Sequence, residues 1–145
     1  MLCLKYRFKT SFENIVKATL CKYNEQNDGN WFTRRFKTHI TIAEARPLDP
    51  DRILIKRRMS AIKGTAVQGF EDIIIDRKTH RIEMFLHEGG DPQIQERCSY
   101  EGGNNEGGVS YELTSFKLHT SKIFRKKIFN WGISKLELKI TEIEK

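Results

Sequence analysis

Apolar and polar residues alternate at the beginning of the chain. The apolar residues of segment 2–9 share one face of an extended strand, opposite basic residues, and they are Leu2, Leu4, Tyr6 and Phe8. A period of two is typical of a half-buried strand. From Phe12 to about residue 23 the apolar residues recur every three or four positions, which predicts an amphipathic helix. We therefore expect a strand, a helix and then a polar loop over residues 24–30.

The period of two returns in the middle of the chain and predicts several antiparallel strands. Segments 31–45 and 53–61 flank a turn at residues 47–51 that is rich in proline and aspartate, so they should form a long hairpin. Four shorter strands are expected over residues 67–76, 80–88, 93–101 and 109–118.

Helical spacing reappears over residues 119–143. Apolar residues recur at three and four positions from Phe129 to Ile143, and the opposite face is expected to carry Lys122, Arg125 and Lys126. Gly132 weakens the middle of this helix and allows a bend there. A curved antiparallel sheet of about six to seven strands, wrapped around the long C-terminal helix, would bury both apolar faces. The predicted fold class is α+β, with one domain over residues 1–145.

Composition narrows the function classes. The 145 residues carry a formal net charge of +7, which favours anionic partners such as nucleic acid, anionic membrane surfaces or acidic small ligands. No apolar run approaches the roughly 20 residues that span a bilayer, so we expect a soluble intracellular protein. The cysteines and histidines show neither disulfide nor metal spacing, and no cofactor is expected. No acid, base and nucleophile come together, so enzyme activity is not expected.

Two arginines interrupt the apolar faces of the predicted hairpin. Arg34 lies between phenylalanines, and Arg57 lies between Ile55 and Met59. A charge in a core is costly unless it is paired and hydrogen-bonded. Either the arginines form internal ion pairs with Glu71 or Glu96, or they face an anionic ligand in a cavity.

Several short motifs, in the same order along the chain, resemble the PRELI/MSF1 family. They include Lys22-Tyr23-Asn24 after the first helix, the hairpin segment 49–59, Glu71-x-x-x-Ile75-Asp76 and Glu96-x-x-x-Tyr100. Segment 60–70 is shorter than in the family and lacks its proline–tryptophan pair and lid. The chain therefore looks like a shortened member.

The resemblance implies a StART-like helix-grip fold and a role in phospholipid transfer. The implied cargo is phosphatidic acid or phosphatidylserine, carried across the mitochondrial intermembrane space, with a small twin-CX9C helical protein as a possible partner. By motif position the headgroup residues would be Lys22, Arg58 and Lys63, with Lys139 where the family has asparagine. Arg34 and Arg57 are added to these headgroup residues because they interrupt the apolar faces of their strands. A contact with anionic membranes is expected from Lys122, Arg125, Lys126 and Lys127.

Two other functions stay open. Trp31 and Phe32 beside basic residues could stack nucleic-acid bases, although no RNA-binding motif is visible, so nucleic acid is the less expected partner. A lipid-free interaction scaffold would instead have a filled interior, with its arginines neutralised by Glu71 or Glu96. For a lipid carrier, replacing Arg57 or Lys63 by alanine should weaken anionic lipid binding and leave the fold intact.

Overall fold

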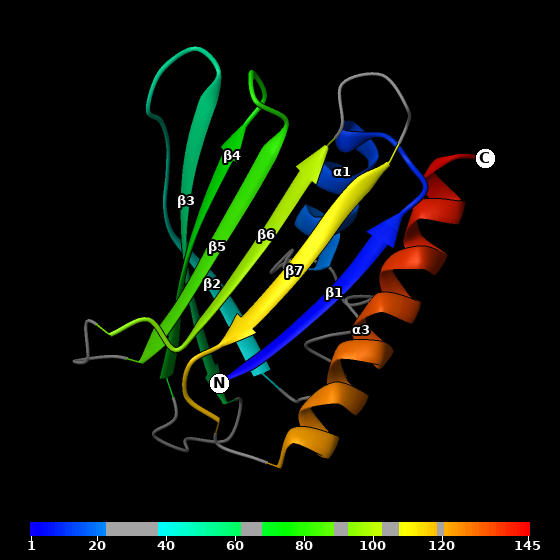
Figure 1. The fold of residues 1–145 in the computed structure, drawn as a ribbon. Helices are drawn as coiled ribbons and strands as arrows, with labels where there is room; N and C mark the ends of the chain where they lie inside the picture. The colour runs from blue at the N-terminus through cyan, green and yellow to red at the C-terminus, as the bar shows by residue number, and fades with distance from the viewer. Residues whose placement is uncertain (23–37, 62–67, 89–92, 103–107, 119–120) are drawn as a thin grey trace.

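The computed structural model describes residues 1–22, 38–61, 68–88, 93–102, 108–118 and 121–145. Two helices and seven strands make up this part of the chain (Figure 1). In chain order they are β1 (Leu2–Phe8), α1 (Phe12–Lys22), β2 (Thr38–Pro47), β3 (Arg52–Ala61), β4 (Gln68–Asp76), β5 (Arg81–Glu88), β6 (Glu96–Gly102), β7 (Val109–Ser115) and α3 (Lys122–Ile143).

All seven strands belong to one antiparallel sheet. Its order is β1-β7-β6-β5-β4-β3-β2, so every strand from β2 to β7 pairs with its neighbour in the sequence. The exception is β1, which pairs with β7 from Leu2 opposite Ser115 to Phe8 opposite Val109. The first strand of the chain therefore forms one edge of the sheet, and β2 forms the other.

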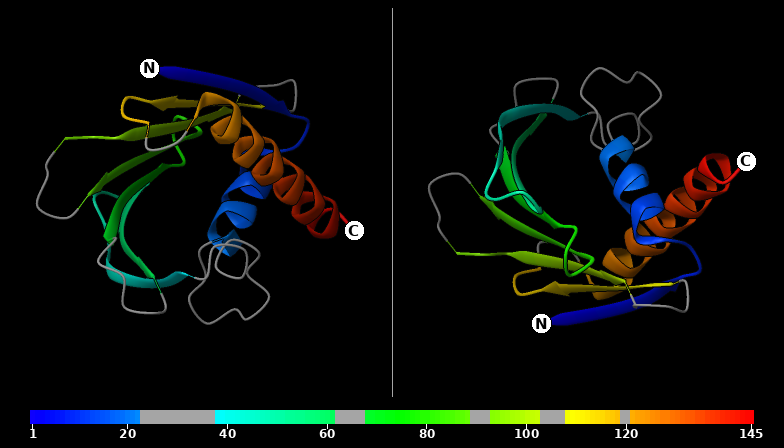
Figure 2. Two further views of the ribbon diagram at one scale, coloured as in Figure 1. Left: turned by 90° about the horizontal axis from the view of Figure 1, so that it is seen from below. Right: turned by 90° about the horizontal axis from the view of Figure 1, so that it is seen from above.

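The sheet is curved, and both helices lie on its concave side (Figure 2). Alternate residues of each strand point toward the helices, as the period of two predicts. Ile73, Ile82 and Leu113 on this face are almost completely buried, together with Ile15 and Val16 of α1. The inner face of α3 completes the core with Phe129, Ile133, Leu136 and Ile140. This confirms the predicted α+β class, a curved sheet around a long C-terminal helix.

Local polar contacts fix the turns between these elements. The Asp49 carboxylate accepts hydrogen bonds from the backbone N–H groups of Asp51 and Arg52, which holds the predicted turn between β2 and β3. Asp76 accepts from the N–H groups of Lys78 and Thr79 in the same way between β4 and β5. The long hairpin and the next turn are thus confirmed, whereas residues 31–37 of the predicted strand lie outside the described part.

Two predicted strands are longer than the strands that form. Ile94 was expected on the inner face with Glu96, but β6 begins only at Glu96, and the Ile94 side chain is 42% exposed. At the other boundary, β7 ends at Ser115, and Phe116 takes the outward position after that buried residue and is exposed. The Phe116 N–H bonds to the carbonyl of Gln95. The inward alternation in the sequence therefore extends to Ile94, beyond the start of β6.

The long helix begins where a side chain caps it. Ser121 is the N-cap, and its hydroxyl accepts a hydrogen bond from the backbone N–H of Phe124. The helix therefore starts at Lys122 rather than at residue 119. From there α3 continues as one element through Gly132 to Ile143.

Candidate functional site: a cavity between the sheet and α3

A cavity of about 120 Å³ lies between the concave face of the sheet and the inner face of α3. Strands β4 to β7 contribute Glu71, Met84, Leu86, Glu96, Cys98 and Tyr111 to its lining. Helix α3 contributes Arg125, Ile128, Phe129, Trp131, Gly132, Ile133 and Leu136. The walls are mostly apolar or aromatic, and two carboxylates and a guanidinium are the charged groups among these residues.

A column of aromatic rings connects the sheet with α3 beside the cavity. The Tyr100 and Tyr111 rings stack with their centroids 4.5 Å apart, and Tyr111 stacks on Phe129 at 5.6 Å with the planes nearly parallel. Tyr100 and Tyr111 face each other on neighbouring strands, and both lie on the inner face. These contacts fix how closely this part of α3 approaches the sheet.

Arg57 is a buried charge on the inner face of β3. Its side chain is 2% exposed, and it forms an ion pair with Glu71 of β4, which is 8% exposed, at 3.9 Å between Nη1 and Oε1. The two residues stand directly opposite each other in the β3–β4 register. Of the two possibilities left open by the sequence for Arg57, the internal ion pair with Glu71 is the one that forms.

A second ion pair joins α3 to the sheet at the edge of the cavity. Arg125 donates to both carboxylate oxygens of Glu96, from Nε at 2.8 Å and from Nη2 at 3.0 Å. Burial alone would lower the pKa of Arg125, but the hydrogen bonds and negative charge of Glu96 outweigh it and hold the pKa above its ordinary value. This two-point contact is the strong, directional form of an arginine–carboxylate pair.

Gly132 leaves room where most helix residues would have a side chain. It lines the cavity in the middle of α3, and a Cβ placed on it would meet no described atom within 4 Å. Glycine inside a helix costs about 1 kcal/mol relative to alanine. No neighbouring atom lies close enough to require glycine at this position. The missing side chain therefore adds open space to the cavity.

The predicted headgroup residues do not gather at this cavity. Arg58 is the neighbour of Arg57 on β3, so it points to the outer face, where it is exposed. It therefore points away from the cavity, because successive strand residues point to opposite faces. Lys139 pairs with Glu142 on α3 and is not among the lining residues. Lys22 is the last residue of α1, and its side chain, like Arg34 and Lys63, lies outside the described part.

The predicted membrane-facing residues divide into two groups. Lys122, Lys126 and Lys127 are exposed near the beginning of α3, as expected. Arg125 does not belong with them, because it precedes Phe129 by four positions and so shares the inner face of the helix. Its placement on the outer basic face is corrected by its pairing with Glu96.

Other cavity residues were not singled out from the sequence as site residues. Tyr111 and Cys98 lie at alternating positions of predicted strands, so their inward direction followed from the pattern, but a role in lining a cavity did not. Trp131 and Ile128 flank the apolar stripe of α3 and read as ordinary helix residues. Gly132 was the one sign of the cavity in the sequence, since a glycine in the middle of an amphipathic helix costs stability and needs a structural reason.

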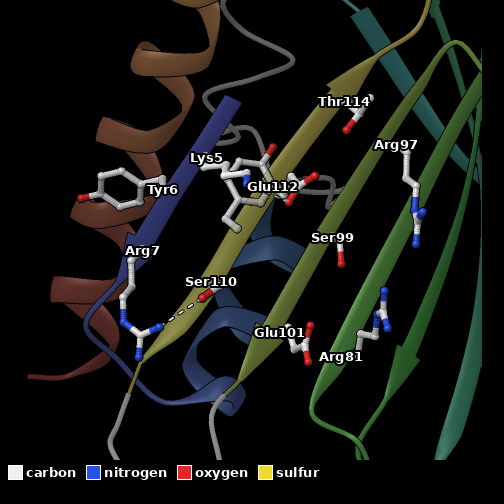
Figure 3. A pocket seen from close by; sticks show the side chains of 11 residues that line it. Lys5, Tyr6, Arg7, Arg81, Arg97, Ser99, Glu101, Ser110, Glu112 and Thr114 are labelled. Carbon is white, nitrogen blue, oxygen red and sulfur yellow. Dashed lines mark hydrogen bonds and ion pairs between the residues drawn. The ribbon is translucent and has the colours of Figure 1, made fainter. Parts of the chain in front are cut away.

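A larger hollow, of about 600 Å³, lies on the outer side of the sheet over β1 and β5 to β7 (Figure 3). Arg81 and Arg97 are directed toward each other there, and both pair with Glu83 at 3.1 Å. Lys5 lies 4.0 Å from Glu112, and Arg7 donates to the Ser110 hydroxyl. Cross-strand pairs of this kind are usual on the solvent side of a sheet. The hollow is open, and the apolar cavity behind α3 is the better candidate site.

Within the described ranges, no group of three or more His, Cys, Asp or Glu side chains could hold a metal ion. In the same part of the chain, neither helix has the length and apolar character needed to cross a bilayer.

The chain resembles known proteins in its fold alone. No family model and no curated protein matches the chain. Among solved structures, TTHA0849 from Thermus thermophilus has a TM-score of 0.53 at 14% identity, covering 99% of both chains. Protein CV1439 from Chromobacterium violaceum has a TM-score of 0.52 at 10% identity, covering 92% of this chain and 94% of its own. Ara h 8.0201 has a TM-score of 0.52 at 13% identity, covering 98% of this chain and 95% of its own. The chain has a helix-grip fold.

Proposed function

We propose that the protein binds an amphipathic ligand in the cavity between the sheet and α3. The observation that carries this proposal is the cavity itself, which has apolar walls from two layers and an arginine–glutamate pair at its edge. Sites for small ligands are concave and mostly apolar, with a few charged groups that fix orientation. This one has that composition.

The apolar walls suit an acyl chain. Met84 and Leu86 of β5 face Ile133 and Leu136 of α3 across the cavity. Each methylene moved from water into such surroundings contributes about 0.8 kcal/mol. The contribution of the chain therefore grows with each buried methylene, against the entropic cost of association.

The charged groups suit an anionic headgroup, and we propose a phospholipid of the phosphatidic acid or phosphatidylserine class. Arginine binds phosphate and carboxylate oxygens through paired N–H donors. Arg125 already holds the Glu96 carboxylate in this way at the edge of the cavity. A phosphate group would exchange places with that carboxylate, while the acyl chains lie toward the apolar walls. Transfer between membranes is the activity that the sequence resemblance adds to this binding.

The size of the cavity sets a condition on loading. Cavities that hold drug-sized ligands measure about 300–1,000 Å³, whereas an apolar cavity of about 150 Å³ accommodates benzene. The 120 Å³ found here is close to the second case. A whole phospholipid therefore requires α3 to move away from the sheet, and the Arg125–Glu96 pair is one of the contacts that must open.

Native mass spectrometry after lipid extraction from cells tests binding, and movement of labelled phosphatidic acid between vesicles tests transfer. A stoichiometric co-purified phospholipid together with transfer supports the carrier function. A protein that neither retains nor moves lipid contradicts it.

Filling the cavity from Gly132 should separate ligand binding from folding. Gly132→Leu places a side chain where no described atom lies within 4 Å of a Cβ. We expect it to displace about two methylenes of ligand and to lower the affinity for a fluorescent acyl probe about tenfold. Gly132→Ala is the matched control. It should retain the probe and raise the free energy of unfolding by about 1 kcal/mol through helix propensity alone.

Equal probe affinity in the two Gly132 variants, with both folded by circular dichroism, would remove the cavity from the ligand site.

A lipid-free interaction scaffold is the second candidate function. Its supporting observation is that Arg57 and Arg125 are each paired with a glutamate, as a neutralised interior requires. For a scaffold, Gly132→Leu would stabilise the protein as much as Gly132→Ala or more, and no lipid would be recovered from cells.

A further inference from the structure

Exposed apolar side chains gather at one end of the molecule. The described residues include eight large hydrophobic residues that are exposed, and five of them come from the end of the molecule where β6 and α3 begin and β7 stops (Figure 1). We call these five the apolar cluster: Met1, Ile94, Phe116, Ile123 and Phe124. Ile123 is 71% exposed and Phe116 is 50% exposed. Single exposed apolar residues are common, but a group at one place indicates an interaction site.

Hydrogen bonds and register bring together the four segments that carry these side chains. Leu2 pairs with Ser115, so Met1 and Phe116 lie just beyond the last rung of the β1–β7 ladder. The Phe116 N–H bonds to the carbonyl of Gln95, the residue after Ile94. Arg125 bonds to Glu96, which ties the first turn of α3, with Ile123 and Phe124, to the same edge.

Exposed lysines lie beside the residues of the apolar cluster in the sequence. Lys117 precedes α3, and Lys122, Lys126 and Lys127 lie in its first two turns, all with exposed side chains. Residues 122–136 contain five lysines or arginines and no aspartate or glutamate. The first turn of α3 likewise has no acidic residue.

This charge arrangement works against the helix. The N-terminal end of a helix carries a partial positive charge, so acidic residues stabilise the first turn and lysines destabilise it. Among the described residues, no carboxylate forms an ion pair with Lys122, Lys126 or Lys127. A local rule broken in this way is typical of a functional surface. The lysines of α3 are therefore better explained by an external anion than by folding.

We infer that the apolar cluster and its lysines form a docking surface for an anionic lipid bilayer. Apolar and aromatic side chains beside lysines are the combination that binds the interface of such membranes, with the apolar groups below the headgroups and the cations among them. The charge complementarity selects an anionic bilayer. A neutral protein partner would leave the lysines without a counterpart, and a nucleic acid would leave the apolar cluster in water.

This inference deepens the proposed function, because the opposite face of the same helix turns lines the cavity. Arg125, Ile128 and Phe129 point inward from the helix turns whose outer side carries Lys126 and Lys127. Docking would bring this end of α3 and the Arg125–Glu96 pair to the membrane surface, where a headgroup can reach them. Vesicle binding itself does not require a ligand in the cavity.

Vesicle flotation with the full chain tests the docking surface. We expect binding to vesicles of phosphatidylcholine with phosphatidylserine, and weak binding to phosphatidylcholine alone. Lys126→Gln with Lys127→Gln should lower the partition coefficient about thirtyfold, since one lysine near an anionic surface contributes about fivefold. Lys56→Gln with Lys78→Gln removes the same charge from other exposed sites and should have little effect.

A matched pair on α3 tests the apolar part. Ile123→Ser should lower vesicle binding about tenfold, since a side chain that enters the bilayer interface is lost. Leu138→Ser is the control, because Leu138 is 60% exposed on the same helix but lies 15 residues further along.

Equal loss of vesicle binding in the two lysine double variants would overturn the inference, and so would equal loss of vesicle binding in Ile123→Ser and Leu138→Ser. Loss of oligonucleotide binding in the Lys126/Lys127 variant, with vesicle binding unchanged, would also overturn it. Acyl-probe binding in vesicle-free solution, measured on the same variants, distinguishes ligand binding in the cavity from docking to the membrane. Normal docking without probe uptake contradicts only the proposed function, and normal probe uptake without docking contradicts only this inference.

Discussion

Replacing Glu71 with glutamine is expected to lower the free energy of unfolding by about 3–5 kcal/mol. The substitution keeps the size of the side chain but leaves the Arg57 guanidinium, 2% exposed, without its carboxylate 3.9 Å away. The attraction between the two charges, which offset the cost of burying Arg57, is lost, and this explains the size of the effect. Denaturation in urea, extrapolated linearly to water, measures it.

The free energy of unfolding of two further variants shows whether the destabilisation comes from breaking the buried ion pair or from losing any carboxylate. Glu142→Gln breaks the surface Lys139–Glu142 pair and should cost less than about 1 kcal/mol. The double change Arg57→Met with Glu71→Leu removes both charges and should recover most of the lost stability, because apolar residues of similar size replace buried ion pairs well. A double variant as unstable as Glu71→Gln would show that the cost comes from packing.

The buried pair also changes the meaning of an Arg57→Ala experiment. From the sequence, this substitution was expected to weaken lipid binding and spare the fold. Because Glu71 would stay buried without the Arg57 charge beside it, the substitution is now expected to destabilise the protein as well. Reduced lipid binding in that variant alone would therefore not identify Arg57 as a ligand residue.

Tyr100 is expected to make the protein sensitive to alkali. Complete burial raises the pKa of Tyr100 well above its ordinary value, since the phenolate would have no water around it. The unfolded chain releases this proton above about pH 10, whereas the folded protein retains it. Its contribution is therefore fully present below pH 10 and falls above that pH by about 1.4 kcal/mol per pH unit. Tyr100→Phe should remove this part of the slope between pH 10 and 12.

The control for Tyr100 is the more exposed Tyr6. A hydrogen bond to Glu137 raises the pKa of Tyr6 too, but this side chain is 37% exposed, so solvent weakens the effect. Tyr6→Phe should change the alkaline slope much less. Equal slopes for the parent protein and Tyr100→Phe would show that the Tyr100 hydroxyl ionises in the folded state.

Hydrophobic periodicity predicted the architecture because each strand has one solvent-exposed face and one buried face. Arg57 and Glu71 fell on inward positions of their strands, and the register then placed them opposite each other. The pattern failed where pairing stops for reasons outside the local sequence. Ile94 continues the inward alternation of β6, yet the strand begins only at Glu96. Phe116 takes the outward position after the buried Ser115, where β7 ends.

Arg125 shows why the site was harder to predict than the fold. Its spacing to Phe129 places it on the inner face of α3, but a charged residue is expected in water unless a partner is known. That partner, Glu96, lies 29 residues earlier on a strand. Only the packing of helix against sheet makes the pair visible. The cavity beside Gly132 is likewise a property of two layers and belongs to neither alone.

The pairing of β1 with β7 has a consequence for how the chain folds as it is synthesised. Strands β2 to β7 can add to the sheet one after another, since each pairs with the next in the sequence. By contrast, β1 has no partner until residues 109–115 have left the ribosome. At about 5–20 residues per second, the roughly 100 intervening residues take about 5–20 s to translate. During that interval Leu2, Leu4 and Phe8 are made but cannot be covered by β7, so the apolar face of the first strand stays without its sheet partner for longer than that of any later described strand.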